Sequence, residues 1–130
     1  MPFDAEPDAQ VTARDRLIRL RDFLGALAPK QFDMSSLSTA CGSPACICGW
    51  AHEVLYGAPI LRPYKDAVMV AGALGLSDQQ ASDMFIVSIG AGHAAMVAGV
   101  GSATPRDAVR LLDNFLETGR VDWRAALDAA

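Results

Sequence analysis

The sequence predicts an all-α fold, an irregular compact bundle of five to six helices around a central apolar helix at about residues 44–56. Two observations predict it. Apolar residues recur at helical spacings of three and four in several segments, and Ser/Thr-Pro and glycine signals mark where those segments begin and end. No segment shows the sustained period-two alternation that is typical of a half-buried β-strand.

Length and composition fit one domain. The chain has 130 residues, 52% of them hydrophobic and 20% charged, with a formal net charge of -4. A chain of this length can bury one substantial hydrophobic core but is too short for two. We expect residues 1–10 to be a flexible leader and residues 11–130 to be a single helical domain. Acids and prolines open the chain where a secretory signal needs a basic start and an apolar run, so we expect a cytoplasmic protein.

The first helix is expected over residues 11–28. Its outer face carries Asp15 and Arg19, which are spaced for an i,i+4 ion pair, and Pro29 ends the helix. Apolar residues at alternating spacings of four and three form its inner face: Ala13, Leu17, Leu20, Leu24 and Leu27.

The central helix follows from a start signal at Ser43 and Pro44, an N-cap followed by a proline in the first turn. Glu53 is the only clearly charged residue between residues 44 and 56. Such a helix has almost no solvent-facing side, so we expect it to occupy the centre of the bundle.

Two helices are predicted in the middle of the chain. The first begins at Pro63 and ends at Gly75. Ser77 to Gln80 form a capping-box pattern that opens the second, which runs through about Phe85. The predicted inner side of the first consists of Tyr64, Ala67, Val68, Ala71 and Leu74.

Two more helices are predicted near the C-terminus. Thr104 and Pro105 repeat the cap-then-proline signal and open a helix that Gly119 ends. Asp122 caps a last short helix through Trp123 and Leu127. The predicted inner side of the longer helix consists of Ala108, Leu111, Leu112, Phe115 and Leu116.

Cys41, Cys46 and Cys48 lie within eight residues and are the most chemically suggestive feature. Cys46 falls in the first turn of the predicted central helix, where free N–H groups and the helix dipole lower a thiol pKa. A reversible Cys41–Cys46 disulfide is one interpretation. A metal site is another, because Cys48 and His52 share a helix face and would add ligands.

Structural packing is the interpretation that we favour for these cysteines. The spacing C-x4-C-x-C-x3-H is not the pair of short knuckles that indicates a zinc site, and buried free cysteine behaves as a small hydrophobic residue. We therefore expect no metal and no cofactor. If Cys46 is buried, Cys46→Ser is expected to cost about 1 to 3 kcal/mol of stability.

Catalysis is not the function that we favour. A nucleophilic cysteine would need His52 or His93 as its base and Glu53 or Asp33 as the orienting carboxylate. The chain has neither a G-x-S-x-G elbow nor an H-E-x-x-H helix.

Three other function classes each rest on a single weak feature. Residues 90–95 match G-x-G-x-x-[GA], but no second convincing strand supports a dinucleotide site. Residues 71–77 resemble a helix-turn-helix elbow, yet no Lys or Arg lies between Lys65 and Arg106 to contact phosphate. Residues 84–103 are uncharged but contain four glycines and a histidine, which disfavours a membrane span.

Residues 41–51, read as C-G-S-P-A-C-I-C-G-W-A, resemble the C-G-[ST]-x-x-C-[IV]-x-G-[WH]-A motif of a family of short uncharacterised bacterial and phage proteins. The resemblance implies a bacterial or phage origin and brings no activity. Cys48 stands where that family commonly has a small residue, a departure that weakens any scheme needing all three thiols. Further matches are Leu74 to Ser77 with Gln80 and Ala81, then Thr104, Pro105 and Ala108, and a C-terminal T-G-x-V-D-W from Thr118 to Trp123.

These observations favour a non-catalytic helical interaction or accessory module. Its predicted contact surface is the uncharged segment Ile86 to Ala103, which would meet a protein partner or a second copy in a homodimer. We expect neither nucleic acid nor membrane as a partner. The alternative is a thiol-based redox or metal-binding module that uses Cys41 and Cys46 with Cys48 and His52.

Overall fold

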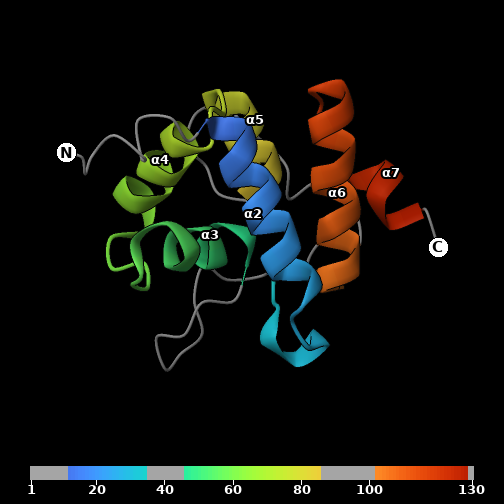
Figure 1. Cartoon of the computed structure of the whole chain (residues 1–130), viewed down its shortest axis with the longest axis horizontal. Helices are drawn as coiled ribbons and strands as arrows, with labels where there is room; N and C mark the ends of the chain where they lie inside the picture. The colour runs from blue at the N-terminus through green and yellow to red at the C-terminus, as the bar shows by residue number, and fades with distance from the viewer. Residues whose placement is uncertain (1–11, 35–45, 86–101, 129–130) are drawn as a thin grey trace, which may run out of the picture.

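The computed structural model describes residues 12–34, 46–85 and 102–128 of the chain. These residues form six α-helices and one short 3-10 helix, with no β-strand among them, so the predicted all-α bundle is confirmed (Figure 1). The helices are α2 (Ala13–Gly25), η1 (Pro29–Gln31), α3 (Ile47–Tyr56), α4 (Pro63–Ala73), α5 (Asp78–Phe85), α6 (Pro105–Thr118) and α7 (Trp123–Asp128).

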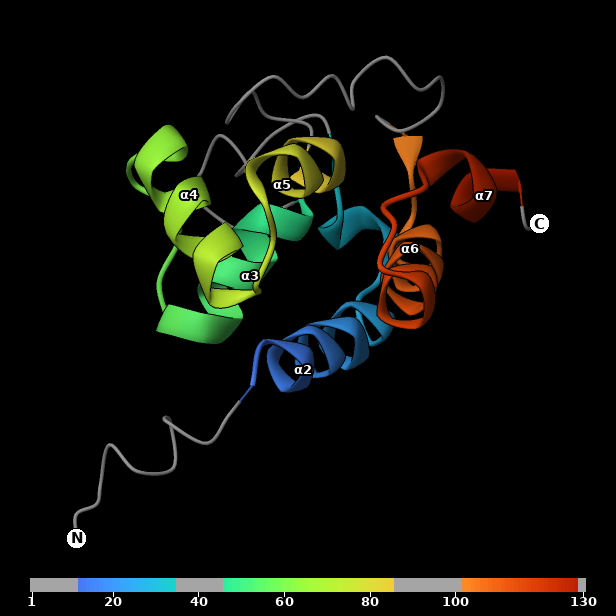
Figure 2. The same ribbon diagram turned by 90° about the horizontal axis from the view of Figure 1, so that it is seen from above.

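The helices gather on two sides of α2. Helix α3 contacts α2, α4 and α5, while α2 also packs along α6, which in turn contacts α7. Figure 2 shows α3, α4 and α5 on one side of α2, with α6 and α7 on the other. Helix α2 therefore joins the two halves of the bundle.

One core runs through both halves. The indole Nε1 of Trp123 donates a 2.9 Å hydrogen bond to the carbonyl oxygen of Asp83, which ties α7 to α5. Because the largest buried side chains come from five different helices, no helix buries its apolar face alone. These side chains include Leu20, Leu24, Ile47, Val70, Leu74, Met84, Phe85, Leu111 and Leu112.

The predicted starts of α5, α6 and α7 are confirmed. The side chains of Ser77, Thr104 and Asp122 each accept a hydrogen bond from a backbone N–H group in the first turn of the helix that follows. Gly75 follows the C-cap Leu74 of α4, and Gly119 is the C-cap of α6. Their φ angles of 71° and 76° are the left-handed conformation that ends a helix.

Three helix ends differ from the prediction. Helix α2 begins at Ala13 after the N-cap Thr12 and not at residue 11. Helix α2 ends at Gly25, where glycine weakens the helix, and Pro29 begins η1 rather than ending α2. Helix α3 begins at Ile47 because Cys46 is its N-cap, with Sγ accepting a 3.4 Å hydrogen bond from the Gly49 N–H. Residues 43–44, which were predicted to start this helix, lie outside the described residues.

The inner face of α4 is rotated from the predicted one. Val68 was predicted to face inward, and this is wrong, because its side chain is 40% exposed. The side chain of Tyr64 is not among those described. The buried face of α4 follows the three-four spacing of Ala67, Val70, Ala71 and Leu74.

Several predictions fall on residues that the structure does not describe. The leader, the glycine motif at residues 90–95 and the segment from Ile86 to residue 101 all lie outside the described ranges. At the end of the predicted contact segment, Ser102 is exposed and Ala103 is buried. None of the helices in the described ranges is both long and apolar enough to cross a bilayer.

Candidate functional site

Two of the three cysteines are described, and both lie in the core. Cys46 and Cys48 are free thiols that are 1% and 0% exposed. Burial raises the pKa of the Cys46 thiol to about 11 and outweighs the hydrogen bond from the Gly49 N–H. Burial likewise raises the pKa of Cys48. The predicted lowering of a thiol pKa at this helix start is therefore wrong. A Cys41–Cys46 disulfide stays a prediction, because Cys41 lies outside the described residues.

His52 is a buried residue with structural partners. Its Nδ1 lies 2.6 Å from the carbonyl oxygen of Ala58, which can only accept, so Nδ1 carries the proton. Its Nε2 lies 3.9 Å from Oδ2 of Asp66. The histidine therefore holds the connection between α3 and α4 against α3.

Asp66 holds the same connection from the side of α4. It is 3% exposed, and its Oδ2 accepts hydrogen bonds of 3.0 Å from the backbone N–H groups of Leu61 and Arg62. The Arg62 Nη2 donates to the other carboxylate oxygen at 3.0 Å. These backbone and guanidinium hydrogen bonds lower the pKa of the Asp66 carboxyl, even though burial opposes them.

The remaining predicted catalytic or metal-binding groups do not form a site in the described part of the chain. No three His, Cys, Asp or Glu side chains in that part are placed to hold a metal ion. Glu53 is half-buried, and Asp33 is exposed. The charge of Asp33 raises the Cys46 pKa further, the opposite of what activates a nucleophile. His93 lies outside the described residues.

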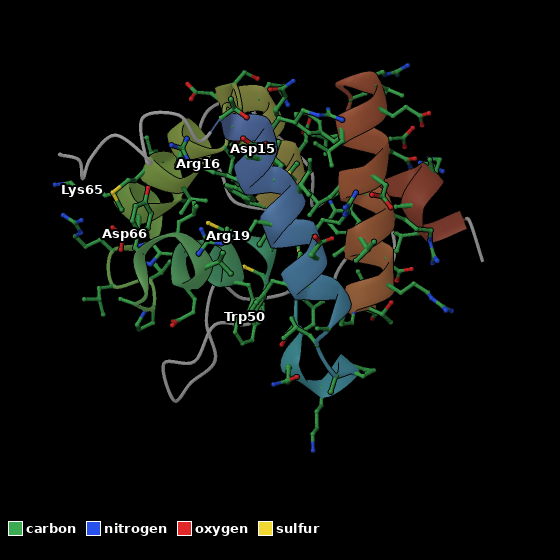
Figure 3. All side chains as sticks on the ribbon, viewed as in Figure 1. Asp15, Arg16, Arg19, Trp50, Lys65 and Asp66 are labelled. Carbon is green, nitrogen blue, oxygen red and sulfur yellow. The ribbon has the colours of Figure 1, made fainter. Side chains whose placement is uncertain are left out.

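A surface groove between α2, α3 and α4 was not predicted. Its volume is about 500 Å³, within the range of ligand-binding clefts. Figure 3 places Arg16 beside α4 and Arg19 beside α3. The groove is lined by Arg16, Arg19, Leu55, Tyr56, Val68, Met69, Gly72 and Ala73.

The outer face of α4 consists of Lys65, Val68, Met69 and Gly72, and the last three of these form one wall of the groove. All four residues are exposed, and Val68 and Met69 are each 40% exposed. The outer face of a surface helix is normally polar. The sequence of α4 carries a signal for this surface. The helix has apolar residues on two faces, but only one face is needed to pack against the core, so the second apolar face indicates a contact surface.

Gly72 on this outer face has no structural explanation within the described residues. A Cβ built on it would meet nothing within 4 Å. Glycine in a helix interior costs roughly 1 kcal/mol relative to alanine. What the glycine does provide is an open place where the backbone of another molecule can approach closely.

Two guanidinium groups form the opposite wall of the groove. Arg16 Nη1 donates to the carbonyl oxygen of Ala73 at 2.8 Å, and Arg19 Nη2 donates to that of Val54 at 3.2 Å. These carbonyls belong to the last turns of α4 and α3, neither of which has a basic residue of its own there. The two arginines therefore complement the negative ends of both helices.

Neither guanidinium pairs with a carboxylate of a described residue. The predicted ion pair between Asp15 and Arg19 is not formed, because the carboxylate of Asp15 instead accepts from the Thr12 N–H in the N-cap of α2. A guanidinium has five N–H donors. Arg16 and Arg19 therefore keep donors for a ligand in the groove.

Comparisons with known proteins give no match: no family model, no curated protein and no solved structure matches this chain. The resemblance of residues 41–51 to short bacterial and phage proteins therefore stays a prediction.

Proposed function

We propose that the protein is a non-catalytic interaction module that binds a helical segment of a partner protein in the groove between α2, α3 and α4. The observation that carries this proposal is the outer face of α4, where Val68 and Met69 are 40% exposed at the edge of a groove. The described cysteines and His52 are, in contrast, buried in the core.

The shape of the groove favours a protein segment over a small molecule. The groove is open to solvent, whereas a small ligand normally buries about 70 to 90% of its surface. The groove itself carries a strip of exposed apolar side chains, since Val68 and Met69 are each 40% exposed and Tyr56 is 43% exposed. An amphipathic helix meets such a strip with anchors three and four residues apart.

Charge disfavours a second copy of the chain as the occupant. In a two-fold dimer through this groove, the same surface of both copies meets itself. Arg16 and Arg19 of one copy would then lie in one interface with the same two arginines of the other. Like charges that face each other in an interface oppose binding, so the occupant is a different chain.

A displayed library of helical peptides tests the proposal. The library is selected on the wild-type protein, and the enriched peptides are measured on Met69→Glu, which puts a charge on the groove wall at an exposed position. The control is Ala125→Glu, at an exposed position of α7 that does not line the groove. Melting curves of both variants confirm that they are folded.

The expected result is a set of peptides that lose at least about tenfold in affinity on Met69→Glu, about 1.4 kcal/mol. The same peptides should bind Ala125→Glu within about twofold of the wild type. The proposal is overturned if no peptide is enriched above background, or if the enriched peptides bind Met69→Glu as tightly as the wild type.

A further inference from the structure

The groove combines exposed apolar side chains with two arginines that have no carboxylate partner in the described structure. From this combination we infer that the partner segment is acidic and that a carboxylate beside its apolar anchors binds Arg16 and Arg19. The inference rests on the proposed function and adds the chemical class of the partner.

The groove is positive although the whole chain has a net charge of -4. The two guanidinium charges face the C-terminal ends of α3 and α4, each of which carries about half a negative charge. About one positive charge therefore remains in the groove.

The spacing of the two arginines fits a single carboxylate-bearing turn. Arg16 and Arg19 are three residues apart on α2, so their side chains are neighbours on one face of that helix. Hydrogen bonds from a guanidinium to a carboxylate are about twice as strong as neutral ones. When an apolar anchor of the partner segment packs against Val68 and Met69, an acidic residue beside that anchor would therefore lie near the guanidinium donors of Arg16 and Arg19.

Outside the groove the arginine contacts of the described residues fall into two groups: Arg14 donates to a backbone carbonyl, as Arg16 and Arg19 do, whereas three others pair with carboxylates. Arg21, Arg62 and Arg110 each pair with an aspartate of the chain itself. None of these three lines the groove. Within the described residues, Arg16 and Arg19 differ from these three because they have no aspartate partner, and they differ from Arg14 because they line the groove beside its apolar wall.

Phosphate is the competing anion, and the apolar wall disfavours it. A nucleic acid presents phosphates along its backbone and gains nothing from Val68 and Met69 unless its bases stack on aromatic side chains. Tyr56 is the only aromatic residue among those that line the groove. A single-stranded oligonucleotide is therefore included in the test as a competitor.

The test uses a displayed helical library in which leucines are fixed at helical spacing and the flanking positions vary among Glu, Gln and Lys. On the wild-type protein we expect Glu to be enriched over Gln and Lys beside the leucines. The best acidic peptide and its Glu→Gln isostere are then synthesised. The acidic peptide should bind at least about threefold tighter, and added salt should reduce the difference.

Arg19→Gln and Arg14→Gln form a matched pair of variants. Both arginines are exposed on α2, and both donate one hydrogen bond to a carbonyl in the last turn of a neighbouring helix. Only Arg19 lines the groove. Arg19→Gln should lower the affinity of the acidic peptide by about three- to tenfold and leave that of the Gln isostere unchanged. Arg14→Gln should change neither.

The outcomes separate this inference from the proposed function. If no peptide is enriched, the proposed function fails and the inference fails with it. The inference alone fails if peptides bind in a Met69-dependent way without a preference for Glu, or if Arg14→Gln weakens binding as much as Arg19→Gln. It also fails if the oligonucleotide displaces the peptide.

Discussion

Arg16 of α2 donates a 2.8 Å hydrogen bond to the carbonyl oxygen of Ala73, the last residue of α4. Arg14 and Arg19 make the same kind of contact with the last turns of α6 and α3. None of the three recipient helices has a basic residue in its own last turn. Three arginines of α2 thus place positive charges at the C-terminal ends of α3, α4 and α6, which have no basic residue of their own there.

This arrangement predicts an order of stability among three substitutions. The Arg16 contact is partly buried, so Arg16→Gln should cost about 1 to 2 kcal/mol. The contacts of Arg14 and Arg19 are exposed, and their Gln variants should each cost about 0.5 to 1 kcal/mol. Urea unfolding measures all three, and three equal values would contradict the arrangement.

Two glycines in and after α4 should respond to alanine in opposite ways. Gly72→Ala places a methyl group in open space and should stabilise the fold by about 0.5 to 1 kcal/mol. Gly75 has a φ of 71°, and its Cβ would lie 2.9 Å from the Cβ of Ala13. Gly75→Ala should therefore cost at least about 1 to 2 kcal/mol. Thermal unfolding measures both, and a loss of stability in Gly72→Ala would show that this position is covered.

The two buried cysteines should differ in their tolerance of serine. Cys48 is 0% exposed inside α3, so a hydroxyl placed there should cost about 1 to 3 kcal/mol. The same cost was expected for Cys46, but Cys46 is the N-cap of α3 and accepts from the Gly49 N–H. Serine can keep that bond, so Cys46→Ser should cost less than about 1 kcal/mol. Equal losses in urea unfolding would rule out the cap role of Cys46.

Acid should weaken the fold through Asp66. Because its folded-state pKa lies below the ordinary value of 3.8, the unfolded chain takes up the proton first as the pH falls. The stability that this carboxylate contributes is therefore complete above about pH 4 and is lost as the pH falls below that. Asp66→Asn should be less stable than the wild type at pH 7, and the difference should shrink below pH 4. A difference that stays constant between pH 7 and pH 2.5 would contradict this role.

The sequence predicts the helices because their start signals are local. The hydroxyl of Thr104 reaches a backbone N–H only three residues away, and Ser77 and Asp122 do the same. Cys46 was missed as an N-cap because the serine and proline before it carry a stronger start signal, and sulfur is a weak acceptor.

The groove is not predictable in the same way. Helix α4 is apolar on two faces, so its periodicity predicts the burial of Ala67, Ala71 and Leu74 correctly but that of Val68 wrongly. The contacts of Arg16 and Arg19 join residues that are 57 and 35 positions apart in the chain. No local pattern encodes such a contact, because it depends on how the helices pack.

We propose that a partner binds on the outer face of α4 while the core stays unchanged, and methionine methyl NMR detects both effects in one experiment. Met69 is 40% exposed beside the groove, whereas Met34 and Met84 are 2% and 0% exposed and serve as internal controls. Titration with the selected acidic peptide should shift the Met69 methyl signal in a saturable way and leave those of Met34 and Met84 in place. An unmoved Met69 signal, or shifts of the two buried methyls as large as its own, would contradict the claim.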